Sequence, residues 1–162
     1  MNAHRPPRLV TASQALCRSC GLCCDGSLFA GVDVDAAERS GNAPPDLPQP
    51  CPHHRAGACA IYADRPRQCR AFTCRVLQAV EDGSRTRDWA ETRIAAMRHL
   101  LAGLDQVLPG EGGLYGRAAA FLEDERAIPD DARIRARIAV YAEMIGDFRP
   151  LSDPETLSRT AR

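Results

Sequence analysis

The 162-residue sequence contains no lysine, few aromatic residues and no excess of either charge. All 21 basic residues are arginines, and they balance 21 acidic residues, so the formal net charge is zero. Aromatic residues make up only 5% of the chain. A protein that binds nucleic acid through bulk electrostatics needs a surplus of cations, and base stacking needs aromatic side chains. These shortages argue against a nucleic-acid-binding protein.

Long apolar runs are also missing. No segment approaches the roughly 20 apolar residues that span a bilayer, and residues 1–16 have two early arginines but no apolar core of a secretory signal. We therefore expect a cytoplasmic protein without membrane contact. Glutathione and thioredoxin keep cytoplasmic thiols reduced, so clustered cysteines there indicate metal or redox chemistry. A disulfide framework is the alternative if the chain is exported.

Cysteine is abundant in one part of the chain only. All eight cysteines lie between Cys17 and Cys74, and none follows. Within this stretch, the Pro-rich residues 41–50 exclude a helix, whereas residues 33–39 suit a short helix with an aspartate near its start. The expected organisation is a flexible or partly helical lead-in (1–16), a cysteine-cluster metal-binding module (17–77), a helical region (86–150) and a C-terminal tail (151–162).

Three segments after the cysteines have the apolar period of amphipathic helices: residues 89–108, 114–126 and 131–148. The side chains expected to point inward are Ala90, Ile94, Met97, Leu101, Leu104, Leu108, Ala118, Phe121, Leu122, Ile134, Ile138, Tyr141, Ile145 and Phe148. The predicted fold is mainly α, with an irregular cysteine-rich module packed on an antiparallel layer of about three helices. A partner-binding or dimerising face is the alternative use of these apolar stripes.

The first cysteine group is Cys17, Cys20, Cys23 and Cys24. Spacings of two intervening residues let sulfurs converge from one tight turn, for which Gly21 supplies backbone freedom. The adjacent pair is expected to point in different directions in an extended backbone. The two thiols of the pair could then serve different metals, or one could bind while the other packs.

The second group, whose spacing is irregular, consists of Cys51, Cys59, Cys69 and Cys74. It does not match the paired knuckles of a zinc ribbon. The first group matches three ligands of a bacterial ferredoxin run but lacks the fourth. Eight sulfurs nevertheless suffice for two four-thiolate sites or one multinuclear site.

Positive charge accompanies the second group. The arginines near it, opposed by the single acid Asp64, are Arg55, Arg65, Arg67, Arg70 and Arg75. A dication with four thiolates carries a net charge of minus two, which nearby guanidinium groups stabilise. A basic patch for RNA or phosphate is the competing interpretation.

Other side chains could take part in such a site. His53 and His54 could replace a cysteine as ligand, or lie on a solvated loop. Asp25 could be a ligand, a hydrogen-bond acceptor or an exposed turn residue. The residues expected to shield the metal, with a catalytic Tyr or Arg as the alternative, are Ile61, Tyr62, Arg65, Pro66, Arg70 and Phe72.

Together these motifs resemble the CxxCxxCC (YkgJ-type) cysteine cluster family of zinc- or iron-chelating domains. The residues that carry the resemblance, over positions 17–75, are Cys17-x2-Cys20-Gly21-x-Cys23-Cys24, Cys51-Pro52 and Cys59-x-Ile61-Tyr62-x2-Arg65-Pro66-x2-Cys69-Arg70-x-Phe72. The resemblance implies metal binding by the cysteines. A flagellin lysine methylase has a similar cluster, but no methyltransferase fingerprint occurs in this sequence.

The leading hypothesis is therefore a protein that holds zinc or iron through cysteine thiolates. The predicted metal ligands are Cys17, Cys20, Cys23, Cys24, Cys51, Cys59, Cys69 and Cys74. A second hypothesis is an iron–sulfur or iron-dependent enzyme or electron carrier, with an open coordination position near Tyr62, Arg65 or His53. A third is a metal-stabilised adaptor that binds a protein partner through its helical region.

Overall fold

The computed structural model describes residues 11–39, 41, 44–124 and 131–150. The predicted C-terminal tail (151–162) and the first ten residues of the lead-in lie outside this part. The helices, which make the protein mainly α as predicted, are α1 (Ala12–Cys20), α2 (Arg67–Ala71), α3 (Arg75–Glu81), α4 (Arg87–Asp105), α5 (Leu114–Glu123) and α6 (Asp131–Ile145). Among the described residues, none of the helices combines the length and the apolar character that crossing a lipid bilayer requires.

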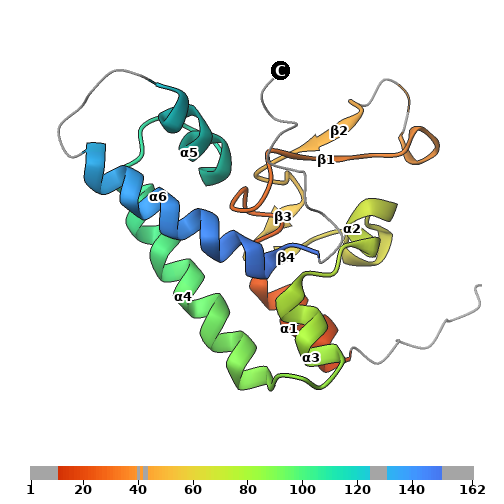
Figure 1. Cartoon of the computed structure of the whole chain (residues 1–162). Coiled ribbons are helices and arrows are strands. Elements are labelled where there is room, and N and C mark those ends of the chain that lie inside the picture. Colours follow the sequence, from red (N-terminus) through yellow and green to blue (C-terminus); the bar gives the residue numbers. More distant parts are fainter. Residues whose placement is uncertain (1–10, 40, 42–43, 125–130, 151–162) are drawn as a thin grey trace, which may run out of the picture.

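Short 3₁₀ turns and two small antiparallel ribbons complete the described fold. The 3₁₀ turns are η1 (Ala36–Glu38), η2 (Tyr62–Asp64) and η3 (Gly146–Phe148). The paired strands are β1 (Gly31–Asp33) with β2 (Asp46–Pro48), and β3 (His54–Arg55) with β4 (Ala58–Cys59). In Figure 1 the ribbons and α2 lie on one side of the molecule, α4 to α6 extend on the other, and α1 and α3 lie between them.

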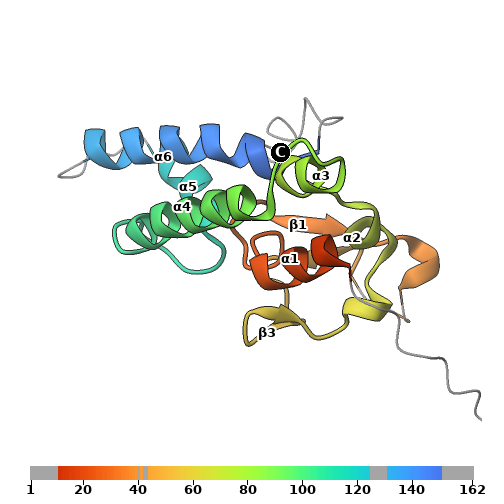
Figure 2. The same ribbon diagram turned by 90° about the horizontal axis from the view of Figure 1, so that it is seen from below.

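The helical layer consists of α4, α5 and α6. Helices α4 and α6 run side by side in opposite directions (Figures 1 and 2), and α5 packs against one end of α4. The predicted inward side chains are all buried except one. Leu122, one position before the end of α5, is 48% exposed. The apolar period thus predicted the layer, with Leu122 as its one wrong inward assignment and Leu114 and Tyr115 as buried residues that it did not include.

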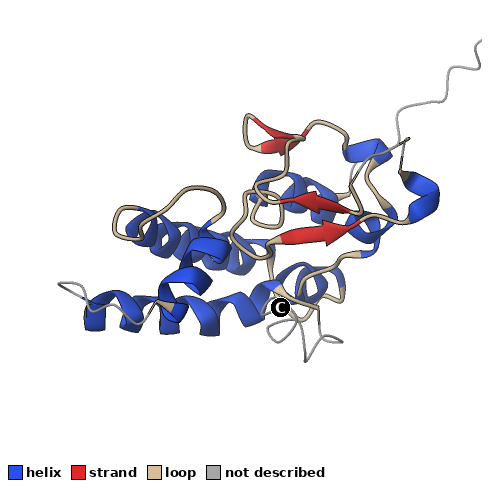
Figure 3. Ribbon diagram, turned by 90° about the horizontal axis from the view of Figure 1, so that it is seen from above, coloured by secondary structure: helices blue, strands red, loops and turns tan. Residues whose placement is uncertain are grey.

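The cysteine module holds several elements that the sequence patterns did not indicate. Helix α1 begins inside the expected flexible or partly helical lead-in, and its N-cap Thr11 forms a capping box with Gln14. The elements without a sequence signal are α2, α3, η2 and the strands β1 to β4; Figure 3 shows the strands in red. Residues 41–50 are non-helical where described, as expected. The predicted helix over 33–39 is only partly correct, because η1 is a single 3₁₀ turn that follows β1.

One loop joins the module to the helical layer. Two groups of the layer contact this junction loop, residues 21–30, and a third contacts Cys20 directly before it. The Tyr141 hydroxyl donates to the Ser27 carbonyl oxygen, and the Tyr115 N–H donates to Gly26 O at 3.0 Å. From α4, Arg98 Nη2 donates to Cys20 O at 2.7 Å, which satisfies a carbonyl at the end of α1. The cysteines thus lie directly against a well-packed support.

Candidate metal centre

All eight predicted ligands are free thiols, and they line two neighbouring cavities. The outer cavity has a volume of about 240 Å³, and the inner cavity about 30 Å³. The sulfurs found only at the outer cavity belong to Cys24, Cys51, Cys59 and Cys69. Those found only at the inner cavity belong to Cys20 and Cys74, and Cys17 and Cys23 border both. The structure therefore brings both cysteine groups together.

The first two cysteines lie on a helix rather than in a turn. Cys17 and Cys20 occupy positions i and i+3 of α1, so their side chains share one face. The helix then ends at Gly21, whose φ of +68° is left-handed. A Cβ at Gly21 would lie 2.8 Å from His54 Nε2. Glycine is required there both by the backbone and by the close approach of the imidazole.

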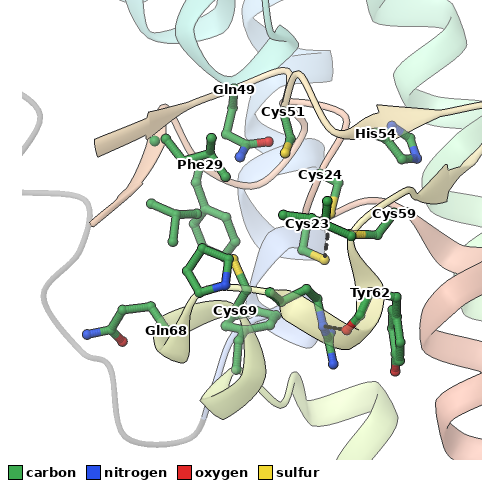
Figure 4. Close-up of a pocket in the computed structure, with 18 of the residues that line it drawn as sticks. Cys23, Cys24, Phe29, Gln49, Cys51, His54, Cys59, Tyr62, Gln68 and Cys69 are labelled. Atoms are coloured by element: carbon green, nitrogen blue, oxygen red, sulfur yellow. Dashed lines mark hydrogen bonds between the residues drawn. The ribbon is translucent and has the colours of Figure 1, made fainter. Parts of the chain in front are cut away.

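The adjacent pair follows in the turn after Gly21. The Cys24 N–H donates to Gly21 O at 2.8 Å, so the backbone is folded rather than extended. The expectation that the two side chains point apart is therefore wrong: their sulfurs lie 3.7 Å from each other (Figure 4). The two thiols nevertheless differ, because Cys23 borders both cavities and Cys24 only the outer one.

Main-chain contacts fix the later cysteines around this turn. The buried Cys51 donates its N–H to Cys24 O at 2.8 Å. Cys59 lies on β4 opposite His54 of β3. Cys69 is carried by α2, and Cys74 caps α3, where its sulfur accepts the Leu77 N–H at 3.4 Å. Together with the segment from Cys17 to Cys24, five chain segments thus supply the sulfurs.

Burial opposes ionisation of most of these thiols. It raises the pKa of Cys20 to about 11, with the neighbouring Cys74 and Cys17 contributing. It also raises the pKa of Cys69 to about 11, and here the nearby thiols are Cys24 and Cys51. Such groups become thiolates at neutral pH only when a bound cation compensates the charge.

The pKa values of Cys23 and Cys24 are shifted in opposite directions. The hydrogen bond to Cys24 is the main reason why the pKa of Cys23 is raised, and burial adds to it. The same hydrogen bond lowers the pKa of Cys24, and Arg65 assists. Within this pair Cys24 therefore loses its proton more readily than Cys23.

Only part of the predicted arginine environment faces the sulfurs. Arg65 lines the outer cavity, donates its Nε–H to Tyr62 O at 3.0 Å and places its guanidinium 3.8 Å from the centre of the Tyr62 ring. By contrast, Arg67 pairs with Asp35 at 2.6 Å, and Arg70 pairs with Glu38 at 3.1 Å. These two ion pairs fix η1 to α2 and neutralise part of the basic patch that was considered for RNA or phosphate.

Two polar atoms at the outer cavity lack partners in the described structure. His54 Nε2 and Gln49 Oε1 are both inaccessible to solvent and make no hydrogen bond. Both residues line the outer cavity (Figure 4). A buried polar atom without a partner is costly, so these two atoms are suited to contact a bound group.

Some of the other candidate side chains line a cavity and others do not. Tyr62, Phe72 and Ile61 line the outer cavity as expected. His53 lines neither cavity. Asp25 lines neither, and its carboxylate accepts the Ser27 N–H at 2.9 Å. Patterns in the sequence did not indicate the cavity residues Arg18, Phe29, Gln49 and Gln68. Only Arg18, between two cysteines of the first motif, carried a signal.

The thiols line common cavities, but their sulfurs are not arranged around a single point as metal ligands would be. Over the described residues, no three Cys, His, Asp or Glu side chains already form a ligand set for one metal ion. Rotation about χ1 moves a sulfur without moving the backbone, so coordination would draw together side chains that already share a cavity wall. The donor set itself, soft sulfur with one imidazole, suits zinc or iron.

Searches against protein-family models, curated proteins and solved structures returned no match for this chain. The resemblance to the CxxCxxCC family therefore stays a hypothesis, which rests on the cysteine motifs and the residues around them.

Proposed function

We propose that this protein binds zinc or iron through the thiolates of its eight cysteines. The observation that carries the proposal is the common location of these residues. They come from five segments, the first and last of which are 50 positions apart, from Cys24 to Cys74, yet all line two adjoining cavities. Cytoplasmic conditions, under which thiols stay reduced, suit this function.

The surroundings of the sulfurs support metal binding. Arg65 contributes a positive charge that offsets part of the negative charge of several thiolates. The ring of Phe72 packs edge-to-face on Phe29 with the ring centres 5.2 Å apart, and both rings shield the sulfurs from water. A bound ion would also supply folding energy to a module whose regular elements are short.

Metal analysis of protein purified without oxygen tests this proposal. The wild-type chain is expected to contain stoichiometric zinc or iron, and Cys20→Ser to contain less and to be less stable. Ser19→Ala, next to Cys20 on the exposed side of α1, serves as the matched control and should retain full metal. Wild-type protein without either metal would refute the proposal. Full metal in Cys20→Ser would remove Cys20 from the ligand set.

The second candidate function is an iron–sulfur or iron-dependent enzyme or electron carrier. The observation that favours it is that Tyr62, Arg65 and His54 line the outer cavity beside the sulfurs, where they could contact a second molecule. A visible absorption spectrum together with iron and acid-labile sulfide analysis distinguishes the two functions. Brown protein with iron and sulfide supports the cluster, and colourless protein with zinc supports the structural site.

The structure does not support the helix face that the adaptor hypothesis requires as a binding surface. The stripe on α6 that would bind a partner consists of Ile134, Ile138, Tyr141 and Ile145, and all four are buried within the protein. This face of the helix is used for internal packing.

A further inference from the structure

The two cavities differ in the walls that enclose their sulfurs. Apart from the cysteines, the inner cavity is lined only by Leu16, Leu22, Leu28, Phe72, Val76, Leu77, Ile94 and Phe148, all of them apolar. Six of these eight are buried, and Leu22 and Phe148 are each 1% exposed. A cavity of about 30 Å³ has room for one ion or one water molecule and for little else.

The outer cavity is larger and more polar. Its volume of about 240 Å³ corresponds to roughly eight water molecules. Exposed residues such as Arg18 and Gln68 contribute to its wall, together with the unpartnered atoms of His54 and Gln49. Cys51 is the one buried cysteine at this cavity. A small molecule that entered here would meet both sulfur and polar groups.

Four cysteines line the outer cavity alone, two line the inner cavity alone, and Cys17 and Cys23 border both. When the two shared residues are assigned to the inner cavity, the inner quartet comprises Cys17, Cys20, Cys23 and Cys74, and the outer quartet comprises Cys24, Cys51, Cys59 and Cys69. The fold supports this assignment, because Cys17 and Cys20 lie on α1, which packs against α3 with Cys74 at its start. Four thiolates complete a tetrahedral zinc site, so each quartet is a full ligand set.

We propose that the quartets form two metal sites of unequal lability, the inner site holding a permanent ion and the outer site an exchangeable one. This inference rests on the proposed function and adds to it a division of roles. The inner ion is bordered by apolar side chains in a cavity of about 30 Å³, which leaves no room for a chelator to bind beside it. The outer ion faces a cavity in which a competing ligand can bind before a thiolate leaves. The outer quartet is thus the site for divalent-metal transfer.

The experiment follows the release of metal from the full-length protein loaded with two equivalents of zinc. Under anaerobic conditions, excess EDTA is expected to remove one equivalent in a fast phase and the other at least about tenfold more slowly. Cys69→Ser should bind one equivalent, keep the slow phase only and retain the fold by circular dichroism. Cys20→Ser should lose the slow phase.

The outcomes separate this inference from the proposed function. Wild-type protein that binds no metal contradicts metal binding itself. Two equivalents released in one phase, or loss of both ions in Cys69→Ser, overturns the two-site division and indicates a single cluster with shared thiolates. A single bound equivalent also overturns it. If Cys20→Ser does not fold, Cys69→Ser still decides the question, because Cys69 does not line the inner cavity.

Discussion

The helical layer and the cysteine module are stabilised in different ways. In the layer, α4 and α6 bury continuous apolar stripes against each other. In the module, the regular elements have between two and nine residues, and many contacts are caps, turns and main-chain hydrogen bonds. Burial of apolar surface stabilises the layer, and module residues such as Leu16, Leu22 and Val76 join the same core. The regular elements of the module are short, however, so under the proposed function we expect the module to be more sensitive to metal removal than the layer.

Removal of metal should give the largest difference in stability between the module and the layer. Structural zinc contributes apparent binding free energies of about 10–16 kcal/mol in small domains, so the metal-free module is expected to unfold while α4 and α6 persist. Hydrogen exchange measured by mass spectrometry before and after chelation would report both regions. The amides of residues 12–81 should lose protection, and those of α4 should keep most of theirs. Equal protection in both states would contradict a metal-dependent module.

Truncation of a buried side chain should destabilise the layer through loss of apolar packing rather than through loss of metal. Leu104 is fully buried in α4, and Leu104→Ala is expected to lower the free energy of unfolding by about 2–5 kcal/mol. Leu122→Ala removes the same atoms from a position that is 48% exposed, and should cost less than about 0.5 kcal/mol. Urea denaturation measures both. Similar losses in the two variants would show that the layer is not packed as described.

A glycine pair sharpens the comparison inside the module. Gly21 and Gly57 both have positive φ, so alanine at either position costs roughly 1–2 kcal/mol of backbone strain. Only at Gly21 would the added Cβ meet another group, His54 Nε2 at 2.8 Å, whereas nothing lies within 4 Å at Gly57. Gly21→Ala should therefore be the more destabilising change and should shift the imidazole NMR signals of His54. Unchanged His54 signals would contradict the close approach.

The contact between the two regions should give the smallest effect. Tyr141→Phe removes the hydroxyl that donates to Ser27 O and is expected to cost about 1 kcal/mol in thermal or urea unfolding. Burial raises the pKa of Tyr141 above its ordinary value of 10. The folded protein holds this proton more tightly than the unfolded chain, so the contribution is complete below pH 10 and declines above it. The stability difference between wild type and Tyr141→Phe should therefore shrink above pH 10. A constant difference would mean that the hydroxyl is not buried.

The sequence predicted the layer better than the module for a physical reason. The stripe from Ala90 to Leu108 has an apolar residue every three or four positions. Because α4 has 19 residues, this period repeats often enough to be recognised in the sequence. Helix α3 has seven residues and is capped by a thiol, Cys74, which is not among the usual capping residues. Short elements with an unusual cap leave no comparable pattern.

The candidate site shows the same division. Residue types and spacing identified all eight cysteines that line the cavities, because sulfur chemistry is readable from composition. They did not show which thiols share a wall, since this depends on the turn at Gly21 and on the hydrogen bond from Cys51 to Cys24. They also did not indicate Gln49, which reaches the outer cavity only because β2 returns alongside β1.

The order of the sulfurs along the chain has a consequence for biosynthesis. Cys24 leaves the ribosome 50 residues before Cys74, which at about 5–20 residues per second is several seconds earlier. During this interval the nascent chain presents first four thiols, two of them adjacent, and then also Cys51, Cys59 and Cys69, while Cys74 is still missing. Oxidants and adventitious ions can reach these thiols until α3 emerges and places Cys74 beside α1.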